Sequence, residues 1–220
     1  MKVYLLMLSE SKSILESDDI YRYISDKRLE RINNHKYVVD KKVLLYTELM
    51  LKKIMCEERG LGIGGIDIRY GCYGKPYIAN LGDCEFSISH TKSTIVIAVN
   101  DFSVGVDIES LDISPNYICI SDRFSSSEQK YINENSDCRI ERLIEIWTKK
   151  ESYLKALGVG LYHSLSSFSV LEKTFFTFKY GDELITVYSD NSESLCNIEK
   201  VIMTEQSIID YFLAPATSLS

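Results

Sequence analysis

Alternating and helically spaced apolar residues divide this chain into strand-like and helix-like segments. Residues 2–8 are almost continuously apolar, which predicts a buried first strand. Residues 18–58 have helical spacing that is interrupted near Asn33 and Asn34, so we expect a mostly helical region in two parts. The chain is therefore predicted to begin as a strand followed by helices.

A second group of segments alternates with a period of two residues, which is typical of strands. Residues 86–89 and 94–99 are joined by His90-Thr91-Lys92-Ser93 and predict a hairpin with a polar tip. The other predicted strands are residues 66–70, 103–109, 168–170, 174–180, 183–188, 196–203 and 208–213. We expect the last five to follow one another as antiparallel strands.

A helix predicted from about Arg139 to Leu157 has a carboxylate within its apolar stripe. At about 100° per residue, Glu151 lies within roughly 20° of the centre of that stripe. The apolar members of the stripe are Ile140, Leu143, Ile144, Trp147 and Leu154. Burying an unpaired carboxylate costs several kcal/mol, so Glu151 implies a cation, a metal or a hydrated cleft beside it.

The ordinary alternative for Glu151 is a surface ion pair. Lys155 follows it at i+4, and such pairs commonly lie on solvated helix faces, where they contribute a few tenths of a kcal/mol. The position of Glu151 in the apolar stripe argues against that alternative. Lys149 and Lys150 point elsewhere, and we expect both on a solvated face.

The strand over residues 103–109 places two carboxylates side by side. Val104, Val106 and Ile108 share one face, so Asp107 and Glu109 share the other, about 6–7 Å apart at their Cα atoms. Two such acids, with a third from a helix, offer hard oxygen ligands suited to Mg²⁺. The alternative is an exposed strand edge that its charges protect from aggregation.

Three further segments present groups that suit a phosphate. Pro76 forces Lys75 into an extended conformation, so that this lysine is presented to solvent or to an anion. His90 lies beside Ser89 at the hairpin tip. It can act as a metal ligand or as a hydrogen-bond donor to a phosphate only together with neighbouring polar groups. A basic cluster forms either a solvated helix face or a phosphate-binding site. It consists of Lys27, Arg28, Arg31, Lys36, Lys41 and Lys42.

A capping box precedes the predicted helix that begins near residue 125. Ser125 fits the N-cap position and Glu128 the third helical position, so that each side chain bonds the backbone of the other. This structural role explains Glu128 without any chemistry.

The composition limits the class of protein. With 220 residues that are 45% hydrophobic, the chain can bury a substantial core, and its net charge of −7 argues against a protein that coats nucleic acid. The six cysteines form no CxxC or Cys/His cluster, so we expect reduced thiols in a cytoplasmic protein. The first apolar run is too short to serve as a signal sequence or a membrane span, so no membrane partner is expected.

Four motifs together resemble the Sfp-type branch of the 4′-phosphopantetheinyl transferase superfamily. The strand Val104-Gly105-Val106-Asp107-Ile108-Glu109 is followed by Trp147-Thr148-Lys149-Lys150-Glu151-Ser152-Tyr153-Leu154-Lys155, and the match extends through Gly158, Gly160 and Leu161. Gly74-Lys75-Pro76 and Phe86-Ser87-Ile88-Ser89-His90-Thr91 are similar to two further motifs of that branch. The resemblance covers residues 1 to 213.

The resemblance implies a fold and a reaction. It implies an α/β (α+β) fold of two similar lobes with pseudo-two-fold symmetry, an N-terminal lobe over residues 1–102 and a C-terminal lobe over residues 103–220. Such a protein moves the 4′-phosphopantetheine group from coenzyme A to a serine of an acyl or peptidyl carrier protein, with Mg²⁺. Because each half plays the part of one subunit, a monomer is expected.

The resemblance also implies roles for the candidate residues. Asp107, Glu109 and Glu151 would bind Mg²⁺, and Glu151 would also accept the proton of the carrier serine. Lys155 would steady the pyrophosphate and the departing bisphosphate. The residues expected to bind coenzyme A are Arg28, Arg31, Lys75, Ser89, His90 and Lys155. Apolar residues after Arg123, Phe124 among them, are expected to form the surface where the carrier docks.

Two other functions stay open at this stage. One is a catalytically silent module that binds coenzyme A or a metal, and the presence of all three acids and Lys155 argues against it. The other is a metal-dependent hydrolase that cleaves the pyrophosphate with water.

Overall fold

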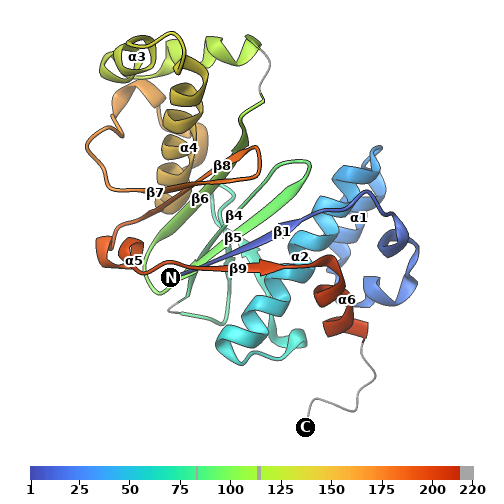
Figure 1. Ribbon diagram of the computed structural model, residues 1–220. Coiled ribbons are helices and arrows are strands. Elements are labelled where there is room, and N and C mark those ends of the chain that lie inside the picture. Colours follow the sequence, from blue (N-terminus) through green and yellow to red (C-terminus); the bar gives the residue numbers. More distant parts are fainter. Residues whose placement is uncertain (83, 113–114, 214–220) are drawn as a thin grey trace.

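Two sheets pack against each other in the computed structural model, which describes residues 1–82, 84–112 and 115–213 (Figure 1). The first has the order β4-β5-β1-β9, with β4 at Glu85–His90, β5 at Thr94–Asn100, β1 at Lys2–Met7 and β9 at Glu199–Met203. The second has the order β6-β8-β7, with β6 at Val104–Ser110, β8 at Glu183–Ser189 and β7 at Phe176–Tyr180. A separate hairpin pairs β2, Ile68–Tyr70, with β3, Pro76–Ile78.

A long helix covers each of the two sheets. α2, Val38–Arg59, packs on the first sheet, and α4, Arg139–Leu157, packs on β6 and β8 of the second (Figure 1). The other helices are α1 at Asp26–Asn34, α3 at Ser126–Asn133, α5 at Ser192–Cys196 and α6 at Glu205–Leu213. Short 3-10 helices lie at Ser13–Glu16, Asp18–Tyr23, Ile63–Gly65, Pro115–Arg123, Gly160–Tyr162 and Leu165–Ser167.

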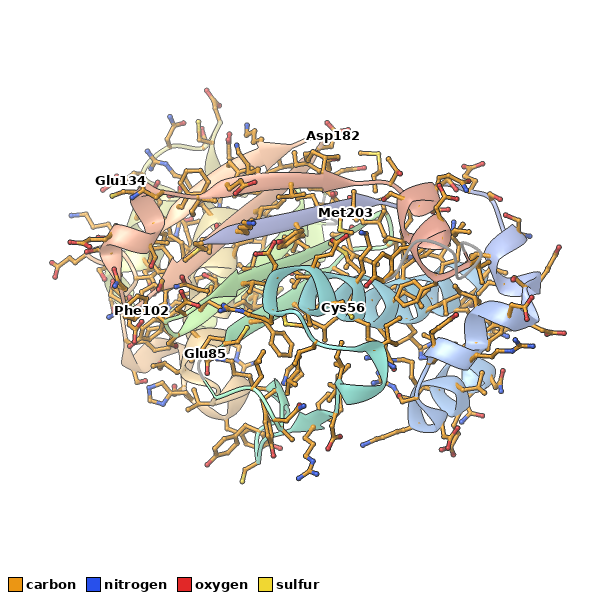
Figure 2. All side chains as sticks on the ribbon, turned by 90° about the horizontal axis from the view of Figure 1, so that it is seen from below. Cys56, Glu85, Phe102, Glu134, Asp182 and Met203 are labelled. Carbon is orange, nitrogen blue, oxygen red and sulfur yellow. The ribbon has the colours of Figure 1, made fainter. Side chains whose placement is uncertain are left out.

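The first strand is buried on both faces, as its continuous apolar run predicts. Tyr4 and Leu6 face α2, whereas Val3 and Leu5 face the second sheet, where they meet Val106. Met203, at the end of β9, and Cys56, on α2, belong to the core on the α2 side of the sheet (Figure 2). β1 therefore lies at the centre of the fold and joins the two halves.

Most of the predicted elements are confirmed. The helical region is broken between α1 and α2, the hairpin consists of β4 and β5, and the capping box of Ser125 and Glu128 begins α3. β7 and β8 are antiparallel, as predicted. The α/β class is confirmed, and no helix within the described ranges has both the length and the apolar composition needed to cross a bilayer.

The prediction of five successive antiparallel strands after residue 167 is wrong in three places. Residues 168–170 form no strand, and Cys196 ends α5 before β9 pairs in parallel with β1. Residues 208–213 belong to α6, because Ile208 and Phe212 are four residues apart and both face the core. Such short apolar runs fit either period, and here the packing against the first sheet decides.

The predicted division at residue 102 stays a prediction. β9 and α6 belong by sequence to the predicted second lobe, and they lie beside β1 and α2 of the first (Figure 1). Residues 214–220, which that lobe also includes, lie outside the described residues.

Candidate active site

Gly105 allows β6 to approach α4 closely. A Cβ atom at this position would lie 1.8 Å from the carbonyl oxygen of Ser152 and 2.6 Å from the backbone nitrogen of Ala156. Because both atoms belong to the backbone of the helix, no side chain larger than hydrogen fits there. The glycine thus brings the acidic face of β6 against the helix that carries Glu151.

Asp107 is the most buried of the three candidate acids, with 4% of its surface exposed. Its Oδ1 accepts hydrogen bonds from the hydroxyl of Ser89, at 2.8 Å, and from Nζ of Lys155, at 2.6 Å. Its Oδ2 is buried and has no hydrogen-bond partner among the described residues. One carboxylate oxygen of Asp107 is therefore held in place and the other is left without a donor.

Glu109 and Glu151 lie with Asp107, and the three carboxylates together are called the acidic group. Nε1 of Trp147 donates to Oε1 of Glu109 at 2.8 Å, which fixes this carboxylate beside α4. Burial raises the pKa of Glu151 to about 7, and the charges of Asp107 and Glu109 act in the same direction, while that of Lys155 opposes them. Burial and the charge of Asp107 likewise raise the pKa of Glu109. The three acids are close enough to repel one another.

This arrangement fits a divalent cation through its donor chemistry. Oε1 of Glu151, like Oδ2 of Asp107, is buried without a hydrogen-bond partner in the described part of the chain, and a hard cation would satisfy both oxygens. Within those same residues, no group of three His, Cys, Asp or Glu side chains is already gathered at metal-binding geometry. The assignment of Asp107, Glu109 and Glu151 as metal ligands therefore stays a prediction.

Lys155 bonds across the site and not along its own helix. Its Nζ reaches Ser89 at 2.8 Å as well as Asp107, so one lysine links β4, β6 and α4. Its carboxylate partner in the described structure is Asp107, whereas the sequence allowed an i,i+4 pair with Glu151. The surface-pair alternative is therefore not what this chain forms.

A cavity of about 640 Å³ lies beside this site. His90, Glu109 and Arg31 line it, together with Lys92 from the hairpin tip. The protein that surrounds His90 lowers its pKa although the side chain is exposed at the cavity wall, and the charges of Lys155 and Arg28 act in the same direction. A backbone hydrogen bond at Thr91 and the charge of Asp40 oppose the shift. The cavity wall thus combines cationic groups with an imidazole whose neutral form is favoured.

Lys75 lies at a second cavity, of about 320 Å³, that Lys155 also lines. Glu151, Lys155 and Tyr73 also line this cavity, so it opens directly onto the acidic group. Nζ of Lys75 donates to Glu85 at 2.6 Å and to the carbonyl oxygen of Ala156 at 3.2 Å. Lys75 therefore lies at the end of α4 and already has a carboxylate partner.

Arg28 and Arg31 take different positions. Arg28 is mostly buried and donates through Nε to Glu48 at 3.2 Å, so part of its guanidinium is already bound. It lines a smaller cavity of about 160 Å³, whereas Arg31 lines both that cavity and the larger one beside His90. Of the two, Arg31 lines the cavity that Glu109 also lines.

Comparison with known proteins decides the family. The family model described as the 4′-phosphopantetheinyl transferase superfamily matches residues 103–192, which include β6 and α4. A 4′-phosphopantetheinyl transferase of Bacillus subtilis is 32% identical over 172 residues, covering 77% of this chain and 76% of the relative. The chain belongs to the 4′-phosphopantetheinyl transferase superfamily. The family predicted from the sequence motifs is therefore confirmed.

Two further relatives show how far the similarity extends. The 4′-phosphopantetheinyl transferase Sfp of Bacillus subtilis strain 168 is 27% identical over 201 residues, which cover 90% of this chain and 86% of the relative. The human L-aminoadipate-semialdehyde dehydrogenase-phosphopantetheinyl transferase is 28% identical over 154 residues, covering 64% of this chain and 50% of the relative. The similarity includes both halves of this transferase.

The transferase buries one lysine that the sequence placed on a solvated face. Lys150 has no exposed surface, and its Nζ forms an ion pair with Glu128 at 2.8 Å and donates to the carbonyl oxygens of Leu165 and Phe168. The prediction was wrong because α4 is covered on two sides, by the second sheet and by the segment after residue 160. Ile140, predicted in the apolar stripe, is conversely 42% exposed.

The docking surface predicted around Phe124 is also corrected. Phe124 is 1% exposed and packs beside Trp147 within the core that α3 and α4 share. A residue so fully covered contacts no partner, so Phe124 stabilises the transferase from within. Its place after the charged residue Arg123 gave no indication of this burial.

Proposed function

We propose that this transferase moves the 4′-phosphopantetheine group of coenzyme A to a serine hydroxyl of an acyl or peptidyl carrier protein, leaving adenosine 3′,5′-bisphosphate. The observation that supports it best is the buried group of Asp107, Glu109 and Glu151 beside Lys155. Asp107 and Glu151 each have a buried carboxylate oxygen without a partner among the described residues, and Glu109 lines one cavity while Glu151 lines another. Three acids and a lysine placed beside two cavities suit a reaction at a pyrophosphate.

Asp107, Glu109 and Glu151 would hold Mg²⁺ through their carboxylate oxygens. When bound, the ion offsets the negative charge that builds up on the transferring and leaving oxygens. Trp147 holds Glu109 in position, and Lys155 and Ser89 hold one oxygen of Asp107, so that the donor set is partly oriented in advance. Support comes from the unpaired buried oxygens described above.

Glu151 accepts the proton of the carrier serine in this proposal. Glu151 lines the 320 Å³ cavity beside Lys155, so its carboxylate lies next to the space open to a substrate hydroxyl. Lys155 donates to the departing bisphosphate, for which its three N–H donors and its position in the wall of the 320 Å³ cavity are suited. Loss of either residue should therefore lower the rate of transfer.

Coenzyme A is held by groups that line the two cavities. His90 donates to its phosphates, and Ser89 does so once its single hydroxyl proton turns away from Asp107. Lys75 binds beside the adenine nucleotide, and Arg31 with Arg28 binds the 3′-phosphate. Arg31 and Lys92 line the larger cavity, and Lys75 and Lys155 line the smaller one. The forked guanidinium of Arg31 suits a terminal phosphate better than a lysine does.

The proposal also covers the oligomeric state, the cellular location and the partners of the transferase. Each half of the chain supplies one long helix against a sheet, and the site lies between β6, α4 and β4, which supports a monomer as the working form. All six cysteines are free thiols, which supports a cytoplasmic location. Carrier protein domains are the expected macromolecular partners, with no role for nucleic acid or membrane.

The decisive experiment mixes the purified protein with coenzyme A, Mg²⁺ and a panel of apo-carrier domains. Intact mass of each carrier shows whether a serine has gained the 4′-phosphopantetheine group. Glu151→Gln should abolish the mass gain while coenzyme A binding largely persists. Glu141→Gln on the same helix, whose side chain is 52% exposed, is the matched control and should stay active.

Two results would contradict the proposed transfer, and a third would contradict only the role of Glu151. Free pantetheine phosphate without modified carrier would indicate a pyrophosphate hydrolase. Coenzyme A binding with neither product would indicate a silent binding module. Unchanged turnover of Glu151→Gln would remove that residue from the mechanism and leave the transfer itself intact.

A further inference from the structure

A buried carboxylate outside the acidic group joins the two halves of the transferase. Glu183 begins β8 and is 7% exposed. It accepts hydrogen bonds from the hydroxyls of Thr91 and Ser93, the latter at 2.9 Å, and both belong to the turn between β4 and β5. The turn of the β7–β8 hairpin lies beside this turn (Figure 1). Glu183 therefore connects the turn between β4 and β5, in the first sheet, to the beginning of β8, in the second sheet.

The turn that Glu183 contacts is itself fully ordered by hydrogen bonds. The hydroxyl of Thr91 accepts from the backbone nitrogens of Ser93, at 3.2 Å, and Thr94, at 3.1 Å, which uses both of its acceptor positions. Its single proton is left for Glu183. The proton of Ser93 goes to the same carboxylate, so both hydroxyls are used by one partner from the other half.

The contact lies beside the groups that the proposed function assigns to substrate. His90 directly precedes Thr91, and His90, Glu109 and Glu183 line the same 640 Å³ cavity. Glu183, on β8, pairs in register with Ser110 of β6, which is the residue after Glu109. A shift of the turn would thus move His90 relative to Glu109, across the space where the phosphates are proposed to bind.

We propose that Glu183 is a positioning residue for coenzyme A binding. It holds the turn of residues 91–93 against the second sheet, so that Ser89 and His90 face the acidic group from a fixed distance. A carboxylate removed from water is attracted strongly to its hydroxyl donors, which makes it a firm link between two hairpin ends. The inference rests on the proposed function of His90 and Ser89.

The test measures coenzyme A affinity by calorimetry and transfer kinetics on the full chain. Glu183→Ala should weaken coenzyme A binding roughly 5- to 20-fold, a range typical of coupling between linked sites. The rate at saturating coenzyme A should change less than about twofold, because the reacting groups themselves stay in place. Glu183→Gln keeps an amide oxygen that accepts from both hydroxyls and should bind within about threefold of the unchanged protein.

Matched variants separate positioning from a general loss of structure. Glu172→Ala removes an exposed acid from the same half, so it has the same change of charge and should bind normally. Thr91→Val removes one of the two hydroxyls that donate to Glu183 and should weaken binding by itself, yet add little to Glu183→Ala. Melting temperatures identify any variant that does not fold, and the remaining variants then carry the test.

Each outcome has a distinct meaning. Normal coenzyme A binding by Glu183→Ala and Thr91→Val, when His90→Ala binds weakly, would overturn the inference and leave the proposed function standing. Equal loss in Glu183→Gln and Glu183→Ala, or additive loss in the double variant, would also overturn it. If His90→Ala binds coenzyme A normally, the role of His90 in the proposed function fails, independently of Glu183.

Discussion

The carbonyl oxygen of Ser152 lies only 1.8 Å from the position that a Cβ atom on Gly105 would take. This contact fixes the distance between β6 and α4, and with it the distance between the acids that the two elements carry. Asp107 and Glu151 are two and one residues away from the contact in sequence, so a change there is transmitted directly to the site.

Gly105→Ala should therefore affect both stability and activity. Overpacking of this kind costs about 1–3 kcal/mol, and more where the added atom clashes with backbone atoms. The free energy of unfolding should therefore fall by at least about 1 kcal/mol. Transfer should fall more than about tenfold, because small displacements of catalytic groups are costly. Urea unfolding and steady-state kinetics measure the two effects. Gly62→Ala, which meets no atom within 4 Å, is the control and should change neither.

Removal of one partner of the buried pair Glu128–Lys150 should strongly destabilise the protein. Lys150→Met leaves the carboxylate of Glu128 buried without its cation, which costs about 3–5 kcal/mol. The double variant Glu128→Gln with Lys150→Met should lose less than the two single changes combined. Chemical unfolding of all three variants completes the cycle. Lys179→Met, from a pair that is more than half exposed, should cost less than about 1 kcal/mol, and an equal loss there would contradict the prediction.

The raised pKa of Glu151 predicts that the free energy of unfolding depends on pH in protein treated with a chelator. The folded state keeps this proton up to a pKa of about 7, whereas the unfolded state releases it near the ordinary value of 4.5. The stabilising contribution is therefore complete below pH 4.5 and is lost as the pH rises through about 7. Glu151→Gln, which cannot ionise, should be more stable than the unchanged protein at pH 8 by about 1–3 kcal/mol.

Urea unfolding with EDTA at pH 4 and pH 8 checks this prediction. The advantage of Glu151→Gln should shrink to nearly nothing at pH 4, where both proteins carry an uncharged group. An advantage of the same size at both pH values would mean that the effect comes from packing and not from charge.

Lys75→Ala should mainly raise the concentration of coenzyme A needed for half-maximal rate. The lysine lines the 320 Å³ cavity and is proposed to bind beside the nucleotide, away from the transferred group. The rate at saturation should fall less than about threefold. Glu85→Gln removes the partner of Lys75 and leaves its charge free, so coenzyme A should bind at least as well. A large fall in saturated rate with no change in the coenzyme A requirement would contradict the assignment.

The sequence by itself determined the local elements and the faces on which key residues lie. The alternation in β6 put Asp107 and Glu109 on one face, and helical spacing put the half-buried Glu151 among the apolar positions of α4. The capping box at Ser125 and the helix end at Gly158, with φ of 69°, followed from local chemistry as well. These features depend on neighbours within a few residues, which the order of amino acids fully specifies.

Only the tertiary structure decided what covers each face. Lys150 is buried because a distant segment, residues 165–170, folds over it, and Lys155 bonds to Asp107 because Gly105 brings β6 against α4. The contact of Glu183 with Thr91 and the parallel pairing of β9 with β1 join residues far apart in the chain. Periodicity shows which side chains share a face, whereas the partner of that face is chosen by packing between segments that the local pattern does not connect.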